Sequence, residues 1–512
     1  MFSKYAQLLC FYYIVFIVVW NRHVVSFSDI RSLPGFSASL PFKLETGYIG
    51  VGDLEFFYYF IQSERDPSKD PLILWLTGGP GCSALSGLFF EIGKISDYFW
   101  CLVSPTGDSI VTCNDVNLGP LQFNMVEHNG SLPTFALNPY SWTKVANIIF
   151  LDAPVGTGFS YSTTLQGFET GDKRFANDGY NFLRKWLQSH PKFITNSLYI
   201  AGDSYAGKIV PIIVHAISDG IEDENFPAFN LKGYLVGNPA TGSKYDDNSK
   251  IPFYNRMALI SDELYESAKR NCKEEYVEVE MSNVICAKDL QAISECIAHI
   301  NKPHILEPEC PSDFDPPDSS VNERKYFLET REEDCLQAPA EYPKFGCRNY
   351  NTYLCKIWAS DDSVQQALGI RKGTIREWIR CNESLLYDKD VGSVLDYHLS
   401  LNTKGYRALI YSGDHDRLVP YVGTESWIKS LNLSIVDDWR PWFVDDQVAG
   451  EEVTRLQSSN RRNVLQCSID GFPKNLYDKL LHLNSPGSVL ALLGFLMPFQ
   501  ICKQWRFHAT NS

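Results

Sequence analysis

Ser204 lies in a segment whose small neighbours suit a reactive serine. The segment GDSYAG, residues 202–207, joins an apolar run to the start of a helical pattern. It is close to the nucleophile elbow G-x-S-x-G, in which a tight turn from strand to helix exposes the serine hydroxyl above a sheet. The match is inexact, because Gly207 stands one residue late and Ala206 fills the small position. Ser204 is therefore the candidate nucleophile, and the alternative is a serine that only caps the following helix.

A glycine-rich segment supplies backbone amides that could stabilise a developing oxyanion. The residues TGGPGCS, 77–83, follow the apolar run ILWL and precede a helical pattern. Consecutive glycines allow neighbouring N–H groups to point at one oxygen atom. We expect the amides of Gly79 and Tyr205 to form this pair.

A third segment contains acidic residues just beyond an apolar run. The residues YSGDHDRLVP, 411–420, include Asp414 and Asp416. In the chain order serine, acid, histidine, such an acid orients the histidine that activates the serine. We expect Asp416 rather than Asp414 to have this role, and the alternative for Asp416 is an N-cap of a helix near 423–429.

Short apolar runs alternate with helical patterns, and these elements must position the three segments. The runs are ILWL (73–76), NIIFL (147–151), LYIA (198–201), YLV (234–236) and ALIY (408–411), and helical patterns span 172–188 and 205–218. This alternation predicts an α/β fold with a mostly parallel, doubly wound sheet. Reactive groups then gather beyond the carboxyl ends of the strands. The alternation stops in residues 240–400, which we expect to form an inserted, disulfide-tied cap region.

The composition favours a globular protein of the secretory pathway. The chain has 512 residues and a net charge of −15, so nucleic acid is not an expected partner. Its fourteen cysteines favour an oxidising compartment. Lys4 and the apolar residues 8–20 predict a signal peptide at 1–28, because this apolar core is too short for a stable membrane span. The alternative is an uncleaved anchor. The glycosylation sequons begin at Asn129, Asn382 and Asn432. No Cys-x-x-Cys pair is present, and neither a metal nor a cofactor is expected.

Seven segments of the chain together resemble the plant serine carboxypeptidase-like proteins. They are LPFKLETGYIGV, LTGGPGCSALSGLFFE, NIIFLDAPVGTGFSYS, GDSYAGKIVP, LISDELY, YSGDHDRLVP and DDWRPWFVDDQVAG. The resemblance implies an α/β-hydrolase fold, secretion with the vacuole as alternative, and a serine acyl-enzyme. The two parts of the hydrolase core are then expected at 29–239 and 401–450. The resemblance also implies three disulfides, which pair Cys82 with Cys355, Cys272 with Cys286, and Cys310 with Cys347.

The substrate is expected to be a small-molecule ester or a peptide. The resemblance implies that Thr77, Gly78, Glu91 and Asp203 line the substrate site. Family peptidases carry Asn and Glu where this chain has Thr77 and Asp203, and the shorter acid and the hydroxyl suit a peptide carboxylate less well. We therefore expect acyl transfer from a glucose ester, with removal of C-terminal residues from peptides as the alternative.

Two regions depart from the family pattern. The glycine-rich segment with the family's catalytic histidine does not follow Gly450, and neither His482 nor His508 has a matching context. We interpret residues 451–512 as a frame-shifted tail from alternative splicing or a gene-model error. We interpret 94–119 as a retained intron, with a surface loop as the alternative. A chain without its base would be a weak enzyme, an inactive splice isoform or a non-catalytic binding protein.

Overall fold

The computed structural model describes residues 26–90, 118–222, 229–307, 349–444, 447–456 and 465–469. Several predictions concern residues outside these ranges. The residues outside the described ranges include most of the signal peptide, most of the insert at 94–119, Glu91, Cys310, Cys347, His482 and His508.

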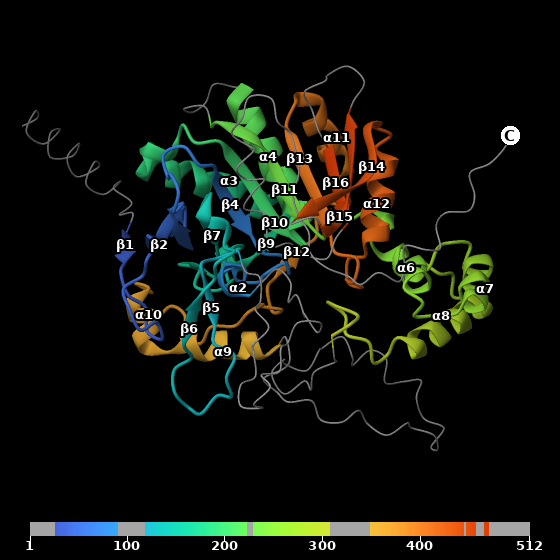
Figure 1. Ribbon diagram of the computed structural model, residues 1–512, viewed down its shortest axis with the longest axis horizontal. Helices are drawn as coiled ribbons and strands as arrows, with labels where there is room; N and C mark the ends of the chain where they lie inside the picture. The colour runs from blue at the N-terminus through green and yellow to red at the C-terminus, as the bar shows by residue number, and fades with distance from the viewer. Residues whose placement is uncertain are drawn as a thin grey trace, which may run out of the picture.

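A large twisted sheet forms the centre of the described chain (Figure 1). Along the sheet the strands follow the order β1-β2-β3-β7-β4-β10-β11-β13-β16-β15-β14, and β8 pairs with β3. Their bounds are β1 Ser26–Ile30, β2 Leu44–Val51, β3 Leu54–Ile61, β4 Leu72–Leu76, β7 Asn147–Leu151, β8 Tyr161–Ser162, β10 Leu198–Asp203, β11 Leu231–Gly237, β13 Arg407–Ser412, β14 Ser434–Val444, β15 Gln447–Leu456 and β16 Leu465–Ile469.

The six central strands from β7 to β16 run parallel, which confirms the predicted sheet. All five apolar runs lie in these strands. The antiparallel strands at the two ends, β1–β3 and β14–β15, were not predicted.

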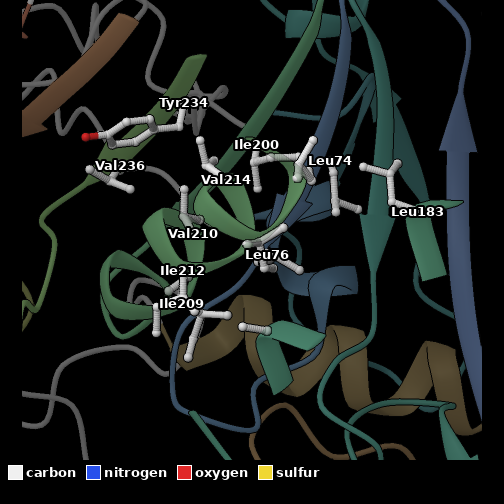
Figure 2. Packing of buried hydrophobic residues seen from close by; sticks show 14 of the residues in the cluster. Leu74, Leu76, Leu183, Ile200, Ile209, Val210, Ile212, Val214, Tyr234 and Val236 are labelled. Carbon is white, nitrogen blue, oxygen red and sulfur yellow. The ribbon is translucent and has the colours of Figure 1, made fainter. Parts of the chain in front are cut away.

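Both faces of the sheet are covered, so alternate residues of a central strand such as β4 enter different cores. In β4, Leu72, Leu74 and Leu76 face one core, and Ile73 and Trp75 face the other. The first core contains α3 Asp172–Ser189, α4 Ala206–Glu222, α11 Leu395–Lys404 and α12 Tyr421–Ser430. Figure 2 shows Leu74, Leu76 and Ile200 beside the apolar side chains of α4. The second core contains α2 Ala84–Phe89, α9 Asn349–Ser360 and α10 Asp362–Ala367.

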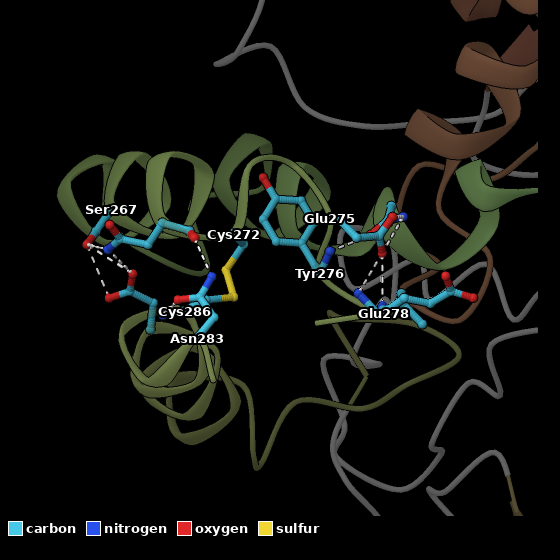
Figure 3. The surroundings of a disulfide bond; sticks show 11 residues. Ser267, Cys272, Glu275, Tyr276, Glu278, Asn283 and Cys286 are labelled. Atoms are coloured by element: carbon cyan, nitrogen blue, oxygen red, sulfur yellow. Dashed lines mark hydrogen bonds between the residues drawn. A yellow bond between two sulfur atoms is a disulfide. The ribbon is translucent and has the colours of Figure 1, made fainter. Parts of the chain in front are cut away.

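A third, smaller core lies within the region predicted as a cap. Its helices are α6 Lys250–Arg256, α7 Asp262–Cys272 and α8 Val284–Cys296, and the start of α12 packs against them. The short helix α5, Lys244–Asn248, precedes them, and its Tyr245 packs against the first core. Helices α6, α7 and α8 lie to one side of the sheet in Figure 1. The predicted disulfide between Cys272 and Cys286 joins α7 to α8 (Figure 3). The rest of the predicted cap contributes helices α9, α10 and α11 to the two sheet cores.

The remaining described elements are short. They are β5 Leu121–Phe123, β6 Phe135–Leu137, β9 Thr170–Gly171 and β12 Tyr387–Asp388, and the 3-10 helices Trp142–Lys144, Gln166–Phe168 and Pro191–Phe193.

Candidate functional site

Ser204 occupies the sharp turn between β10 and α4. Its φ angle is +53°, a left-handed conformation that a non-glycine residue adopts only when its surroundings hold it there. A Cβ on Gly202 would lie 2.4 Å from the Leu76 carbonyl oxygen, and one on Gly207 would lie 2.5 Å from Pro239 Cβ. Both glycines are therefore required by close packing around the turn, and Gly207 serves this purpose despite standing one residue late.

The backbone of Ser204 is fixed by the loop that follows β11. The Ser204 N–H donates to the Gly237 carbonyl at 2.9 Å, and the Ser204 carbonyl accepts from the Ala240 N–H at 2.9 Å. Ser204 is partly exposed, and its hydroxyl has no hydrogen-bond partner among the described residues. The elbow thus presents a hydroxyl that is accessible to a substrate.

The glycine-rich segment packs directly against the elbow. Strands β4 and β10 are neighbours, with Leu76 opposite Gly202. A Cβ on Gly78 would lie 2.7 Å from Ser204 Cβ and 2.9 Å from the Tyr205 nitrogen. The Gly78 N–H donates to Asp203 Oδ1 at 3.3 Å, so this amide already has an acceptor. Gly79 has a φ of +117°, which only glycine adopts without strain.

Asp416 lies at the same edge of the sheet as Ser204. Strands β10, β11 and β13 are in register, so that Asp203, Gly237 and Tyr411 stand side by side at their carboxyl ends. Asn238 follows Gly237, and its Nδ2 donates to Asp416 Oδ2 at 2.8 Å. One loop therefore contacts both the backbone of Ser204 and the carboxylate of Asp416.

Asp416 and Asp414 have different hydrogen-bond partners. The Asp416 carboxylate accepts from the Leu418 N–H at 2.7 Å, whereas Asp414 faces the neighbouring His415, with 2.5 Å between its Oδ1 and His415 Nδ1. The helix after this loop is α12, and its N-cap is Pro420. Asp416 is therefore not the N-cap of that helix.

No histidine in the described part of the chain is hydrogen bonded to the Ser204 hydroxyl. His190 is buried and contacts Glu45, with 2.8 Å between Nε2 and Oε1. His398 is buried beside Tyr234, and this burial lowers the pKa of its imidazole to about 3. His190 and His398 therefore contact Glu45 and Tyr234 rather than Ser204.

Two buried carboxylates flank the site and were not predicted from the sequence. Asp172 accepts from the phenol of Tyr205 at 2.7 Å and from Lys208 Nζ at 3.0 Å. Burial, together with the hydrogen bond to Asp172, raises the pKa of the Tyr205 phenol. Asp172 opens the predicted helix 172–188, but its partners lie elsewhere in the chain, so the sequence contained no local signal for the contact.

The second missed carboxylate, Asp152, holds the helix that follows the glycine-rich segment. It accepts from the Ser83 hydroxyl at 2.6 Å and from the N–H groups of Ala84 and Phe159 at 2.9 and 3.0 Å. Complete burial raises the pKa of Asp152 to about 6, although these hydrogen bonds oppose the shift.

The predicted pairing of Cys82 with Cys355 is wrong. Cys82 lies opposite Cys381 in an isolated antiparallel bridge, and the two form a disulfide. Cys355 is buried in α9, within the second core of the sheet. Disulfide connectivity depends on which chain segments meet in the fold, and cysteine spacing does not reveal it.

The three sequons have different surroundings. Asn129 and Asn432 are exposed. Asn382 is partly buried, and its Nδ2 donates to the Gly156 carbonyl at 2.8 Å. In Asn382, the nitrogen that would carry a glycan is therefore engaged in a hydrogen bond within the protein.

Within the described residues, no three His, Cys, Asp or Glu side chains gather as metal ligands would. Over the same residues, none of the helices combines the length and the apolar character needed to cross a bilayer.

The sheet order and the elbow at the carboxyl edge define an α/β-hydrolase fold. The same fold occurs in a prohormone-processing carboxypeptidase of Saccharomyces cerevisiae, Kex1Δp, which matches 89% of this chain and 94% of its own at a TM-score of 0.63 and 19% identity.

Sequence comparison identifies the family within that fold. Residues 34–97 and 104–464 match the serine carboxypeptidase family. Serine carboxypeptidase-like 2 of Arabidopsis thaliana is 45% identical over 88% of this chain and 89% of its own length. Serine carboxypeptidase-like 17 of the same plant is 44% identical over 85% of this chain and 87% of its own length. The chain belongs to the serine carboxypeptidase family.

Proposed function

We propose that the chain is a secreted serine carboxypeptidase-like enzyme, extracellular or vacuolar, that forms an acyl-enzyme on Ser204. The observation that supports this most directly is the packing of Gly78 against the elbow, where an added Cβ would lie 2.7 Å from Ser204 Cβ. This packing leaves no room for a side chain between the glycine amides and the serine. A nucleophile and oxyanion donors must be adjacent in this way for acyl transfer.

In the proposed reaction, Ser204 Oγ attacks an acyl carbonyl carbon and loses its proton to water, because no histidine among the described residues is hydrogen bonded to it. The carbonyl oxygen becomes an oxyanion that accepts hydrogen bonds from the N–H groups of Gly79 and Tyr205. Collapse of this intermediate expels the protonated leaving group and gives the acyl-enzyme. An alcohol or water then attacks the acyl-enzyme and releases Ser204.

Two features of the site favour an ester substrate over a peptide. Asp203 Oδ1 accepts from the Gly78 N–H, so this carboxylate is directed at the glycine-rich segment. Thr77 is buried, and its hydroxyl accepts from Trp75 Nε1 at 3.2 Å. Both side chains thus contact the protein at the positions where a family peptidase would bind the substrate carboxylate. We infer acyl transfer from a glucose ester, with peptide hydrolysis as the alternative.

We further propose that this chain reacts slowly. Residues 451–512 lack the glycine-rich histidine segment of the family. Loss of the base from such a site costs several orders of magnitude in rate and leaves only oxyanion and binding effects. The transcript across residues 93–120 and 450–456 tests whether splicing or a gene-model error produced the insert and the tail.

A fluorophosphonate probe tests the acyl-enzyme proposal. We expect slow labelling of Ser204 in this chain and none in the Ser204→Ala variant. A chimera with a family-type Gly-Gly-His segment after Ile469 should react at least about 100-fold faster, because the base is restored. If neither the wild-type chain nor the chimera is labelled, the proposal is wrong.

Assays of the chimera distinguish the alternatives. Turnover of a hydroxycinnamoyl glucose without cleavage of a blocked dipeptide would support acyl transfer, and the reverse result would support peptidase activity. Binding of the ester by an unlabelled wild-type chain would instead favour a non-catalytic binding protein.

A further inference from the structure

A buried carboxylate collects hydrogen bonds from the elbow and from the chain around it. Asp172 is fully buried. Its Oδ1 accepts from the phenols of Tyr205 at 2.7 Å and Tyr387 at 2.9 Å. Its Oδ2 accepts from Lys208 Nζ at 3.0 Å and from the Val391 N–H at 3.1 Å. Burial of a carboxylate is costly unless its oxygens are satisfied in this way.

These donors come from the elbow and from segments that contact it. Tyr205 is the residue after the nucleophile, and Lys208 lies in the first turn of α4. Tyr387 belongs to β12 and Val391 follows it, while Asp172 is the first residue of α3. The Asp172 carboxylate therefore joins α3, the elbow, the first turn of α4 and the β12 segment.

The geometry of the elbow requires support from outside the turn. Ser204 is held at a φ of +53°, which is unfavourable for a residue with a side chain. The backbone groups of Gly237 and Ala240 hydrogen bond to the backbone of Ser204. The Tyr205 phenol is hydrogen bonded to Asp172, and Lys208 Nζ lies 5.2 Å from the centroid of the Tyr205 ring.

We propose that Asp172 is a positioning residue for the nucleophile, acting through the Tyr205 phenol. By fixing the Tyr205 side chain, it sets the direction of the Tyr205 N–H and of the Ser204 hydroxyl. This inference rests on the proposed acyl-enzyme function for its catalytic consequence.

Tyr205→Phe and Tyr387→Phe form a matched pair for the test. Each removes one hydroxyl that donates to the same oxygen, Asp172 Oδ1, and each leaves the ring in place. Only Tyr205 belongs to the elbow. A general loss of stability should therefore be similar in both variants, whereas a positioning effect should appear only in Tyr205→Phe.

We expect Tyr205→Phe to lower the maximal rate of fluorophosphonate labelling about ten-fold without changing the probe's binding constant, since orientation and not binding is lost. Amides of the peptide 203–209 should exchange with deuterium faster in this variant. Tyr387→Phe should change both measurements less than about two-fold. Equal effects of the two variants, or no effect of Tyr205→Phe, would overturn the inference.

The two measurements separate this inference from the proposed function. Absence of labelling in wild type and chimera contradicts the acyl-enzyme proposal alone. The exchange rates of the elbow peptide still decide whether Asp172 positions Ser204, because they do not depend on catalysis.

Discussion

At the scale of single residues, some side chains of the candidate site belong to recognisable sequence motifs and others do not. Ser204, Gly79 and Asp416 could be proposed from the sequence, because each follows an apolar run and belongs to a short motif. Asp172 and Asp152 could not, since their partners are distant in the chain. Asp152, for example, binds Ser83 across 69 positions of sequence.

The raised pKa of Asp152, about 6, predicts a pH effect on stability. The folded chain binds this proton more tightly than the unfolded chain, in which the carboxyl has its ordinary pKa of 3.8. The stabilisation is therefore complete below pH 3.8 and is lost as the pH rises through 6. This residue alone should make the wild type about 1 kcal/mol less stable at pH 7 than at pH 5.

Denaturant unfolding of wild type and Asp152→Asn at both pH values measures this difference. The variant should lack the contribution. Asp66→Asn is the control, because hydrogen bonds from Ser68 and Lys69 hold the pKa of the exposed Asp66 carboxyl at about 2. The Asp66 carboxyl is ionised at both pH values, so its removal should leave the pH dependence unchanged. An unchanged slope in Asp152→Asn would contradict the prediction.

At the scale of elements, the register of three parallel strands assembles the site. Five of the six central strands, all except β16, were predictable because buried parallel strands are continuous apolar runs. The loop after β11 was not predicted to take part, yet Asn238 in this loop contacts the loop that follows β13. Its Nδ2 donates to Asp416, and its Oδ1 accepts from the Gly413 N–H at 3.2 Å.

We expect Asn238→Ala to lower the free energy of unfolding by about 1–3 kcal/mol more than Asn432→Ala does. Both residues have positive φ angles, +40° and +52°, so the strain of an alanine should largely cancel in the comparison. Asn432 is exposed and its side chain has no hydrogen bond among the described residues. Urea unfolding of deglycosylated variants measures the difference, and equal losses would show that the Asn238 contacts add nothing.

At the scale of the whole molecule, one disulfide connects distant parts of the chain. The bond between Cys82 and Cys381 spans 299 positions, and it joins the glycine-rich segment to the region before β12. The bond between Cys272 and Cys286 spans 14 positions inside the third core. Family resemblance identified the short bond correctly and the long one incorrectly, because only the folded chain places Cys381 opposite Cys82.

Removal of the long bond should destabilise the protein more than removal of the short one. Chain entropy predicts an excess of about 2–3 kcal/mol for Cys82→Ser/Cys381→Ser over Cys272→Ser/Cys286→Ser, since the longer loop restricts the unfolded chain more. Thermal and urea unfolding of the two double variants measure it. Peptide mapping that linked Cys82 to Cys355 would contradict the assignment itself.

The last central strand, β16, lies between β13 and β15 and is paired with both through its backbone. Main-chain pairing does not depend on side-chain identity, so the backbone of β16 can complete this part of the sheet whatever its five side chains are. The place of this strand in the sheet is therefore independent of the chemistry of the residues that follow it. A different sequence after Ile469 would therefore change the chemistry that follows β16 without removing this strand from the sheet.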